Sequence, residues 1–221
     1  STSAVSTLAT CNMVVINGVN TAMGRYPNTG YFTVNSFSGN TSLTSSSLNS
    51  AVTNWTGAQV VARKVAWVTD RSTVTSASGG TLTVTPGNAS YNFANNWGFF
   101  IENDARTLDV QNEWYYNPST KKIRIYSTTS PTNVQVSTID TLVKIQSKSY
   151  ITFDGVNFSG SNKAAFTISA DHITIQNCTI DYSGQDAIWG AQNLATSTGF
   201  IFQNNTIKHT NNNAINLRDN F

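Results

Sequence analysis

Charged side chains are scarce in this sequence of 221 residues. Asp, Glu, Lys and Arg together make up 11% of it, against about 25% in an ordinary soluble domain. The net charge of +2 is not gathered into a cluster, whereas nucleic acids and membrane surfaces attract clustered positive charge. The sequence also lacks an apolar run near the roughly 20 residues of a membrane-spanning helix. We therefore expect no nucleic-acid partner and no membrane span.

Cysteine and histidine are also rare. The sequence contains Cys11, Cys178, His172 and His209, and no other residue of either type. Structural metal sites and disulfide frameworks use more of these residues at closer spacing, so we expect no metal and no disulfide. Cys178 falls in a predicted strand and is interpreted as a small core side chain.

Polarity comes instead from Asn, Ser and Thr, with Asn at 27 positions. These side chains suit stacked strands, because their amides and hydroxyls pair with equivalent residues above and below. The opening residues Ser1–Val5 have neither the basic start nor the apolar stretch of a signal peptide. A secreted or cell-surface location is therefore predicted from composition alone.

A repeat near the C-terminus is the most informative pattern. Ile151–Phe158, Ile173–Ile180 and Phe200–Ile207 are similar segments that begin 22 and 27 residues apart. Each is followed by a short apolar strand, in which Phe166, Ile188 and Ile215 keep matching offsets. A period of this length with two or more strands per repeat predicts a parallel β-solenoid. Val134–Val136 and Leu142–Ile145 predict a fainter first coil, for nearly four coils in all.

The residues before the repeat predict an antiparallel structure. Gln59–Val68 is strongly β-prone, and Ser78–Gly80 is expected to turn a hairpin into Thr81–Thr85, which alternates apolar and polar residues. Asn17 and Gly18 form a tight-turn signal after an apolar strand. Residues 36–50 are polar enough to predict a surface loop. No segment has helical periodicity.

Two elements resemble a known family. Val15–Val19 with Arg25–Asn28 is similar to a VNG…ARYPN element, and a second element is similar to IEN…LD…GEWY…LYIY. The second comprises Phe100–Asn103, Leu108–Asp109, Glu113–Tyr115 and Lys122–Tyr126. Both elements occur in secreted bacterial right-handed parallel β-helix proteins resembling glycoside hydrolase family 141, which includes fucosidases and xylanases. In that family a β-rich domain is inserted early in the helix.

The resemblance implies an all-β protein, a right-handed parallel β-helix with an N-terminal antiparallel β-rich insert domain. Its parts are a leading segment at residues 1–29, the insert-like domain at 30–126 and helix coils at 127–221. Gln111 and Asn112 stand where the family has Pro-Gly, so that turn must differ. The coils that the family has before the insert, and most of those after it, are missing. We therefore expect further coils or a capping partner at the C-terminal end.

Two groups of acidic residues are candidates for chemistry, because a glycosidase needs two carboxylates about 5–10 Å apart. Glu102, Asp109 and Glu113 form the densest group. The family pattern makes these three structural, paired with backbone donors or with Arg106 and Arg124.

The other group lies in the predicted solenoid, where residues one repeat apart share a column on neighbouring coils. Ser159, Asp181 and Lys208 share one column, and Asp186 and Asn213 share another. The candidate catalytic residues are Asp181, Asp186 and His209, and the candidate substrate-binding residues are Trp189, Lys208 and Arg218. Trp189 aligns with Thr167 and Asn216 and is expected to face outward, where sugar rings stack.

The leading hypothesis is a segment of a secreted polysaccharide-degrading β-helix protein that hydrolyses glycosidic bonds with a carboxylate pair and no organic cofactor. The segment alone can be inactive. The first alternative is a non-enzymatic adhesin or carbohydrate-binding solenoid, which low charge and abundant Asn and Thr fit equally well. The second is a polysaccharide lyase, which needs a Lys or Arg base and often Ca²⁺.

Overall fold

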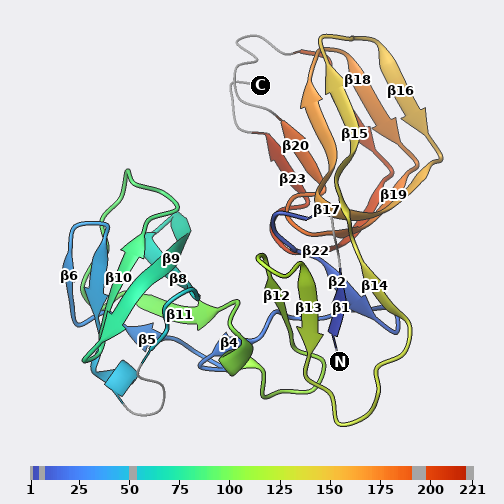
Figure 1. The fold of residues 1–221 in the computed structure, drawn as a ribbon. Coiled ribbons are helices and arrows are strands. Elements are labelled where there is room, and N and C mark those ends of the chain that lie inside the picture. Colours follow the sequence, from blue (N-terminus) through green and yellow to red (C-terminus); the bar gives the residue numbers. More distant parts are fainter. Residues whose placement is uncertain (1, 5–7, 50–53, 191–197, 218–221) are drawn as a thin grey trace. The chain divides into compact units, whose positions relative to one another are not determined.

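The computed structural model describes residues 2–4, 8–49, 54–190 and 198–217, which are almost entirely β-structure (Figure 1). Two 3-10 turns, η1 (Ser46–Asn49) and η2 (Ala105–Thr107), are the helical elements of these ranges. None of the described helices has the length and apolar character needed to cross a membrane. The chain forms two compact units, the first from residues 1–3, 22–117 and 122–130 and the second from residues 4–21, 118–121 and 131–221.

The first unit is built on an eight-stranded sheet in the order β4-β11-β8-β9-β10-β7-β6, with β5 also paired to β11. Its strands are β4 (Arg25–Tyr26), β5 (Phe32–Thr33), β6 (Ser36–Ser38), β7 (Ser42–Thr44), β8 (Gln59–Val65), β9 (Val68–Ser78), β10 (Thr81–Thr85) and β11 (Gly98–Glu102). A three-stranded sheet has the order β1 (Thr2–Ala4), β13 (Lys122–Ile125), β12 (Trp114–Asn117). The paired strands β8 and β11, β9 and β10, and β12 and β13 are antiparallel, as the sequence predicts.

The expected hairpin at Ser78–Gly80 is confirmed, because β9 and β10 pair with Ser78 opposite Thr81. Leu82 and Val84 are buried and Thr83 is exposed, which is the alternation of a strand with one solvated face. The β-prone stretch at 59–68 is not one strand. It breaks at a turn that leaves Trp67 exposed, and β8 folds back on β9.

The prediction of a surface loop at residues 36–50 was wrong. β6 and β7 form a hairpin with Phe37 opposite Leu43, and η1 follows. Leu43 and Leu48 are buried in the core of the first unit. The prediction failed because most residues of this segment are polar. Two apolar side chains are nevertheless enough to anchor a short hairpin to a core formed mainly by other strands.

The second unit contains the parallel β-solenoid of about three turns. One face stacks β16 (Ile151–Asp154), β18 (Ile173–Gln176) and β21 (Ile201–Gln203). The remaining strands form a sheet in which β17 (Asn157–Ser169) is long enough to contribute to two faces. Its other members are β15 (Ile139–Gln146), β19 (Thr179–Ser183), β20 (Ile188–Gly190), β22 (Thr206–Thr210) and β23 (Ile215–Leu217).

The register of the coils confirms the predicted repeat. Phe166 pairs with Ile188, which pairs with Ile215, and Val143 lies one coil earlier beside Phe166. Phe158 likewise pairs with Ile180 and then Ile207. Apolar side chains at equivalent positions stack inside the solenoid because each coil must bury its inward face against the next coil. Cys178 is also buried in this core, as expected, and its thiol is free.

The corners of the coils depend on a left-handed backbone conformation at equivalent positions. This conformation suits Gly and Asn and is uncommon for larger residues. One column of corner residues is Gly155, Asn177 and Asn204; a second is Gly160, Tyr182 and His209; a third is Tyr150, His172 and Gly199, all with positive φ. The spacing of these columns follows the 22- and 27-residue repeat, so the bends belong to the solenoid geometry.

Val134–Val136 was wrongly predicted as a coil strand. As β14 it pairs antiparallel with β2 (Val14–Ile16), which turns into β3 (Val19–Asn20). The turn is the expected one, because Asn17 and Gly18 have φ values of 53° and 77°. A three-residue apolar strand carries no signal that distinguishes parallel from antiparallel pairing. Because β14 is not a strand of a coil, the solenoid has about three turns rather than nearly four.

Candidate functional site

Asp181 lies at the centre of a polar cluster on two neighbouring coils. The parallel register of β17, β19 and β22 places Ser159, Asp181 and Lys208 side by side, as the repeat predicts. Asp181 Oδ1 is 2.7 Å from His209 Nδ1 and accepts the Tyr182 N–H at 2.9 Å. Lys208 Nζ is 3.4 Å from the other carboxylate oxygen. The Asp181 carboxylate therefore contacts both the His209 imidazole and the Lys208 ammonium group.

The imidazole of His209 is held in place from one side. Its ring stacks on Tyr182 with a centroid separation of 4.8 Å and an interplanar angle of 7°. The Tyr182 hydroxyl in turn donates to the Gly18 carbonyl at 2.5 Å. The Asp181 side chain is 14% exposed, whereas Lys208 and His209 are 51% and 43% exposed. The Asp181 carboxylate is thus largely shielded from solvent, whereas the Lys208 and His209 side chains are accessible to it.

Asp186 has a different environment, made of amides. Its Oδ1 accepts from the Asn212 side chain at 2.8 Å and from the backbone and side-chain N–H groups of Asn213 at 3.0 Å. Its Oδ2 accepts from the Asn216 side chain at 3.1 Å. The residue is 8% exposed, and no hydrogen bond among the described residues joins it to Asp181. Asp186 therefore orders the segment before β23, and a substrate atom that reaches it must displace an amide.

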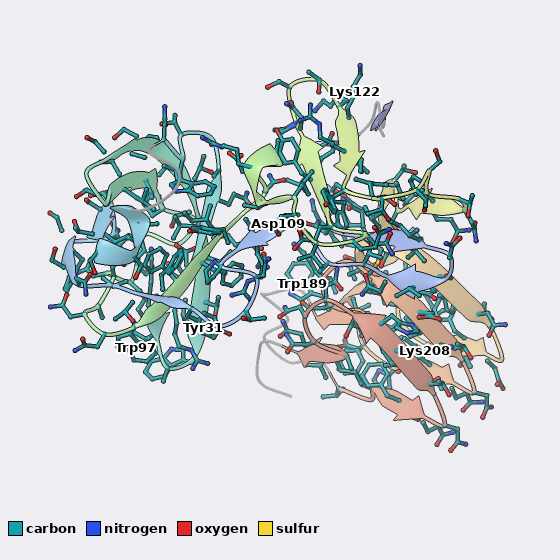
Figure 2. The ribbon with its side chains drawn as sticks, turned by 90° about the horizontal axis from the view of Figure 1, so that it is seen from below. Tyr31, Trp97, Asp109, Lys122, Trp189 and Lys208 are labelled. Carbon is teal, nitrogen blue, oxygen red and sulfur yellow. The ribbon has the colours of Figure 1, made fainter. Side chains whose placement is uncertain are left out.

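Trp189 lies in β20 between Thr167 and Asn216, the neighbours that the repeat predicts. Its side chain is half-buried, while Ile188 and Gly190 on either side of it are buried. Figure 2 labels Trp189 and Lys208 on the strands of the second unit. Arg218, the remaining candidate for substrate binding, lies outside the described residues.

The acidic group Glu102, Asp109 and Glu113 has structural contacts. Glu113 Oε2 accepts the backbone N–H groups of Asp109 and Val110 at 3.1 and 3.0 Å. Glu102 accepts from Arg71 at 2.7 Å. The structural interpretation is confirmed for Glu113 and Glu102, but the expected cationic partners Arg106 and Arg124 were wrong.

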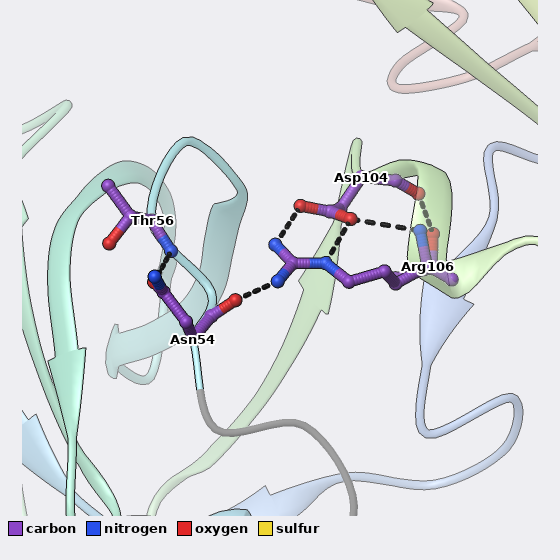
Figure 3. Close-up of polar contacts among 5 residues, drawn as sticks. Asn54, Thr56, Asp104 and Arg106 are labelled. Carbon is purple, nitrogen blue, oxygen red and sulfur yellow. Dashed lines mark hydrogen bonds and ion pairs between the residues drawn. The ribbon is translucent and has the colours of Figure 1, made fainter.

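Arg106 is engaged elsewhere. Its guanidinium contacts both oxygens of Asp104, at 2.7 and 2.5 Å, and also donates to the Asn54 carbonyl (Figure 3). These hydrogen bonds to Asp104 raise the pKa of Arg106. Asp104 was not among the candidates because its partner is only two residues away and no spacing rule singles out such a pair.

Sequence reasoning also missed Tyr182 and the amides around Asp186. The signal for Tyr182 was present, because it precedes His209 by one repeat, which stacks the two rings on adjacent coils. Asn212 and Asn216 carried no such signal among 27 asparagines. Among the described residues, no three His, Cys, Asp or Glu side chains gather in a way that could hold a metal ion.

Comparisons with known proteins identify the fold. No family model matches the sequence, and no curated protein matches it. Among solved structures, a glycoside hydrolase matches with a TM-score of 0.64 and 15% sequence identity. The match covers 81% of this chain and 44% of that chain, so the chain spans less than half the length of the hydrolase. The architecture predicted from the repeat is therefore shared with a glycoside hydrolase.

Proposed function

We propose that this chain is the insert domain and first coils of a polysaccharide-degrading β-helix protein that hydrolyses glycosidic bonds. The observation that supports this most directly is the Asp181–His209–Lys208 cluster on the stacked coils. It combines a sheltered carboxylate with a solvent-accessible imidazole and ammonium group, and the fold that carries it resembles that of a glycoside hydrolase. Similarity to glycoside hydrolase family 141 and a secreted, bacterial origin are parts of the same proposal.

The two proposed carboxylates have neighbours that suit different roles. Asp181 shares a hydrogen bond with a ring nitrogen of His209, through which a proton can be relayed, so we assign proton transfer to the leaving oxygen to Asp181. Asp186 accepts N–H bonds only, which suits the carboxylate that assists water or attacks the sugar. Lys208 and Trp189 would bind the sugar, the first by charge and the second by stacking.

Substitution of each carboxylate tests this assignment. Asp181→Asn and Asp186→Asn, made in the full-length protein, should each lower polysaccharide turnover by roughly 10²–10⁴-fold, the usual contribution of a positioned acid or base. Asp154→Asn is a matched control, because Asp154 is an exposed carboxylate on another face of the same solenoid. Full activity in the Asp181 and Asp186 variants would refute the assignment, and unsaturated products would indicate a lyase.

A binding function without catalysis is the second candidate, and the amides around Asp186 favour it. A carboxylate whose oxygens are already occupied is typical of a structural site. Glycan binding without release of reducing ends would support this candidate over hydrolysis. The Asp181→Asn variant separates the two, since a purely binding protein has no turnover to lose.

The last described coil is also part of the proposal. Ile215 is exposed, and Ile207 and Phe202 are half-buried. The residues at the equivalent positions of the previous coil, Ile188, Ile180 and Ile175, are fully buried. Stacked apolar positions of this kind are normally covered by another coil. We therefore propose that further coils or a capping partner pack on β21, β22 and β23.

A further inference from the structure

A pocket of about 360 Å³ lies on the first unit, separate from the residues assigned to hydrolysis. Three aromatic residues, Tyr31, Trp97 and Phe100, line it together with Arg63 and Asn96. Figure 2 shows Tyr31 and Trp97 near each other on this unit. The volume is at the lower end of the range of roughly 300–1,000 Å³ for small-ligand sites. A pocket of this size can hold a small molecule or a short part of a polymer.

The strand alternation explains why this face of the sheet is hollow. In β11, Phe99 and Ile101 point into the core of the unit and are fully buried. Gly98 and Phe100 therefore lie on the opposite face. A Cβ atom on Gly98 would approach the Tyr31 Cβ to 3.0 Å. The absence of a side chain at Gly98 thus allows the Tyr31 side chain to pack directly against β11 at the edge of the pocket.

Tyr31 is exposed and yet firmly supported. Its side chain is 68% exposed, and its ring lies 6.2 Å from that of Phe100. The Arg25 guanidinium lies 3.8 Å from the Phe100 ring centroid and 5.4 Å from that of Tyr31. Arg25 also donates to the carbonyls of Pro27 and Gly30, directly before Tyr31. An exposed aromatic ring beside a second ring and a guanidinium offers a face on which a ligand can stack.

The polar groups of the pocket indicate the charge of that ligand. Arg63 is exposed and its guanidinium lies 6.0 Å from the Trp97 ring centroid. No acidic residue lines the pocket, and none of the ion pairs of the described residues involves Arg63. Arginine binds carboxylates with two parallel hydrogen bonds, while Tyr and Trp offer apolar faces with polar edges. This combination matches a sugar ring that carries a carboxylate.

We propose that the pocket of Tyr31, Trp97 and Arg63 binds a uronic acid residue of an acidic polysaccharide. The sugar ring packs on the aromatic side chains, and its carboxylate pairs with Arg63. The site goes beyond the proposed hydrolytic site, since it uses no residue of the solenoid. It would hold an acidic polymer on the first unit whether or not the solenoid cleaves it.

Calorimetric titration with short oligogalacturonates tests the proposal, with their carboxyl-reduced counterparts as the neutral probe. The wild-type chain should bind the acidic oligomers at least about tenfold more tightly than the neutral ones at low salt. Trp97→Ala should weaken binding of the acidic oligomers by about tenfold or more. Arg63→Gln should remove the preference for the acidic oligomers and should keep the fold, because Arg63 is exposed.

Two matched controls belong to the same unit. Trp67→Ala removes a tryptophan that is 78% exposed and does not line the pocket, and Arg124→Gln removes an exposed arginine of β13. Both should bind like the wild type. Equal binding of acidic and neutral oligomers, no binding of either, or equal losses in Trp67→Ala and Trp97→Ala would overturn the proposal. Asp181→Asn should keep this binding, so failure of the pocket and failure of the hydrolytic assignment are distinguishable.

Discussion

At the scale of single residues, burial decides how Cys11 and Glu113 contribute to stability. Cys11 lies in the second unit and is buried. Its burial raises the pKa of the thiol to about 12, whereas a solvated thiol has a pKa of about 8.5. Glu113 lies in the first unit, and its carboxylate satisfies two backbone N–H groups that no strand pairing reaches. Each residue therefore affects the free energy of unfolding through one identifiable group.

For Cys11 we expect the stability to depend on pH in alkaline solution. The folded state retains the thiol proton more tightly than the unfolded chain. The free energy of unfolding is therefore unaffected below about pH 8.5 and falls by up to about 1.4 kcal/mol per pH unit above it. Urea unfolding at pH 8 and pH 10 measures this fall. Cys11→Ala should reduce this fall, and an equally steep fall in Cys11→Ala and the wild type would contradict the prediction.

For Glu113 we expect the side-chain oxygen, rather than the charge, to matter most. Glu113→Ala leaves the N–H groups of Asp109 and Val110 without their acceptor, at a cost of about 1–3 kcal/mol for each unsatisfied group. Glu113→Gln retains one acceptor oxygen and should cost less than half as much. Urea unfolding of both variants measures the difference. The prediction fails if alanine and glutamine are equally destabilising.

At the scale of elements, Asn162 joins the long strand β17 to the segment before β2. Its side chain is fully buried, accepts the Asn12 N–H at 2.8 Å and donates to the Thr10 carbonyl at 3.0 Å. It also donates to Asp140 Oδ1 at 2.8 Å. Hydrogen bonds from Lys163 and, to a lesser extent, from Asn162 lower the pKa of the Asp140 carboxyl. A Cβ atom on Gly184 of the next coil would lie 2.2 Å from the Asn162 carbonyl oxygen. This junction is therefore closely packed and has little room to adjust.

Asn162→Ala should consequently destabilise the second unit by about 3 kcal/mol, since several buried polar groups lose their partners together. Asn157→Ala is the matched control, because Asn157 is an exposed residue of the same strand, and it should change the stability by less than about 0.5 kcal/mol. The midpoint of thermal unfolding reports both effects. A similar small shift in the two variants would show that the junction does not support β17.

At the scale of the whole molecule, the two units have separate hydrophobic cores. Trp55, Leu43 and Phe99 belong to the first core, and Phe166 and Ile180 belong to the second. No described residue belongs to both cores. Units with separate cores can unfold in separate steps, because neither depends on the other for burial of its apolar side chains.

Calorimetry of the variants above tests this independence. Glu113→Ala should lower the transition of the first unit, and Asn162→Ala should lower the transition of the second, each leaving the other within about 1 °C by the usual relation of stability to midpoint. The double variant should show both shifts together. A single transition that both substitutions lower equally would mean that the units unfold as one.

The sequence by itself determined the solenoid, because a coil cannot bury its inward face unless equivalent positions repeat. The pairing of Phe158 with Ile180 and of Phe166 with Ile188 followed from the 22-residue offset, and the column of Asp181 and Lys208 followed from the 27-residue offset. The turn at Asn17 and Gly18 was equally local, since positive φ restricts the residues that fit it.

Only the tertiary structure decided what the polar side chains contact. The amides around Asp186 come from residues 26 to 30 positions away, and the pocket joins Tyr31, Arg63 and Trp97 from three segments of the first unit. The sequence predicts a loop around Leu43, whereas in the structure its side chain packs in a core that other strands of the first unit contribute to. The physical reason is that periodic burial is encoded locally and repeatedly, whereas a single contact between unlike residues depends on strand order and register, which short apolar strands do not encode.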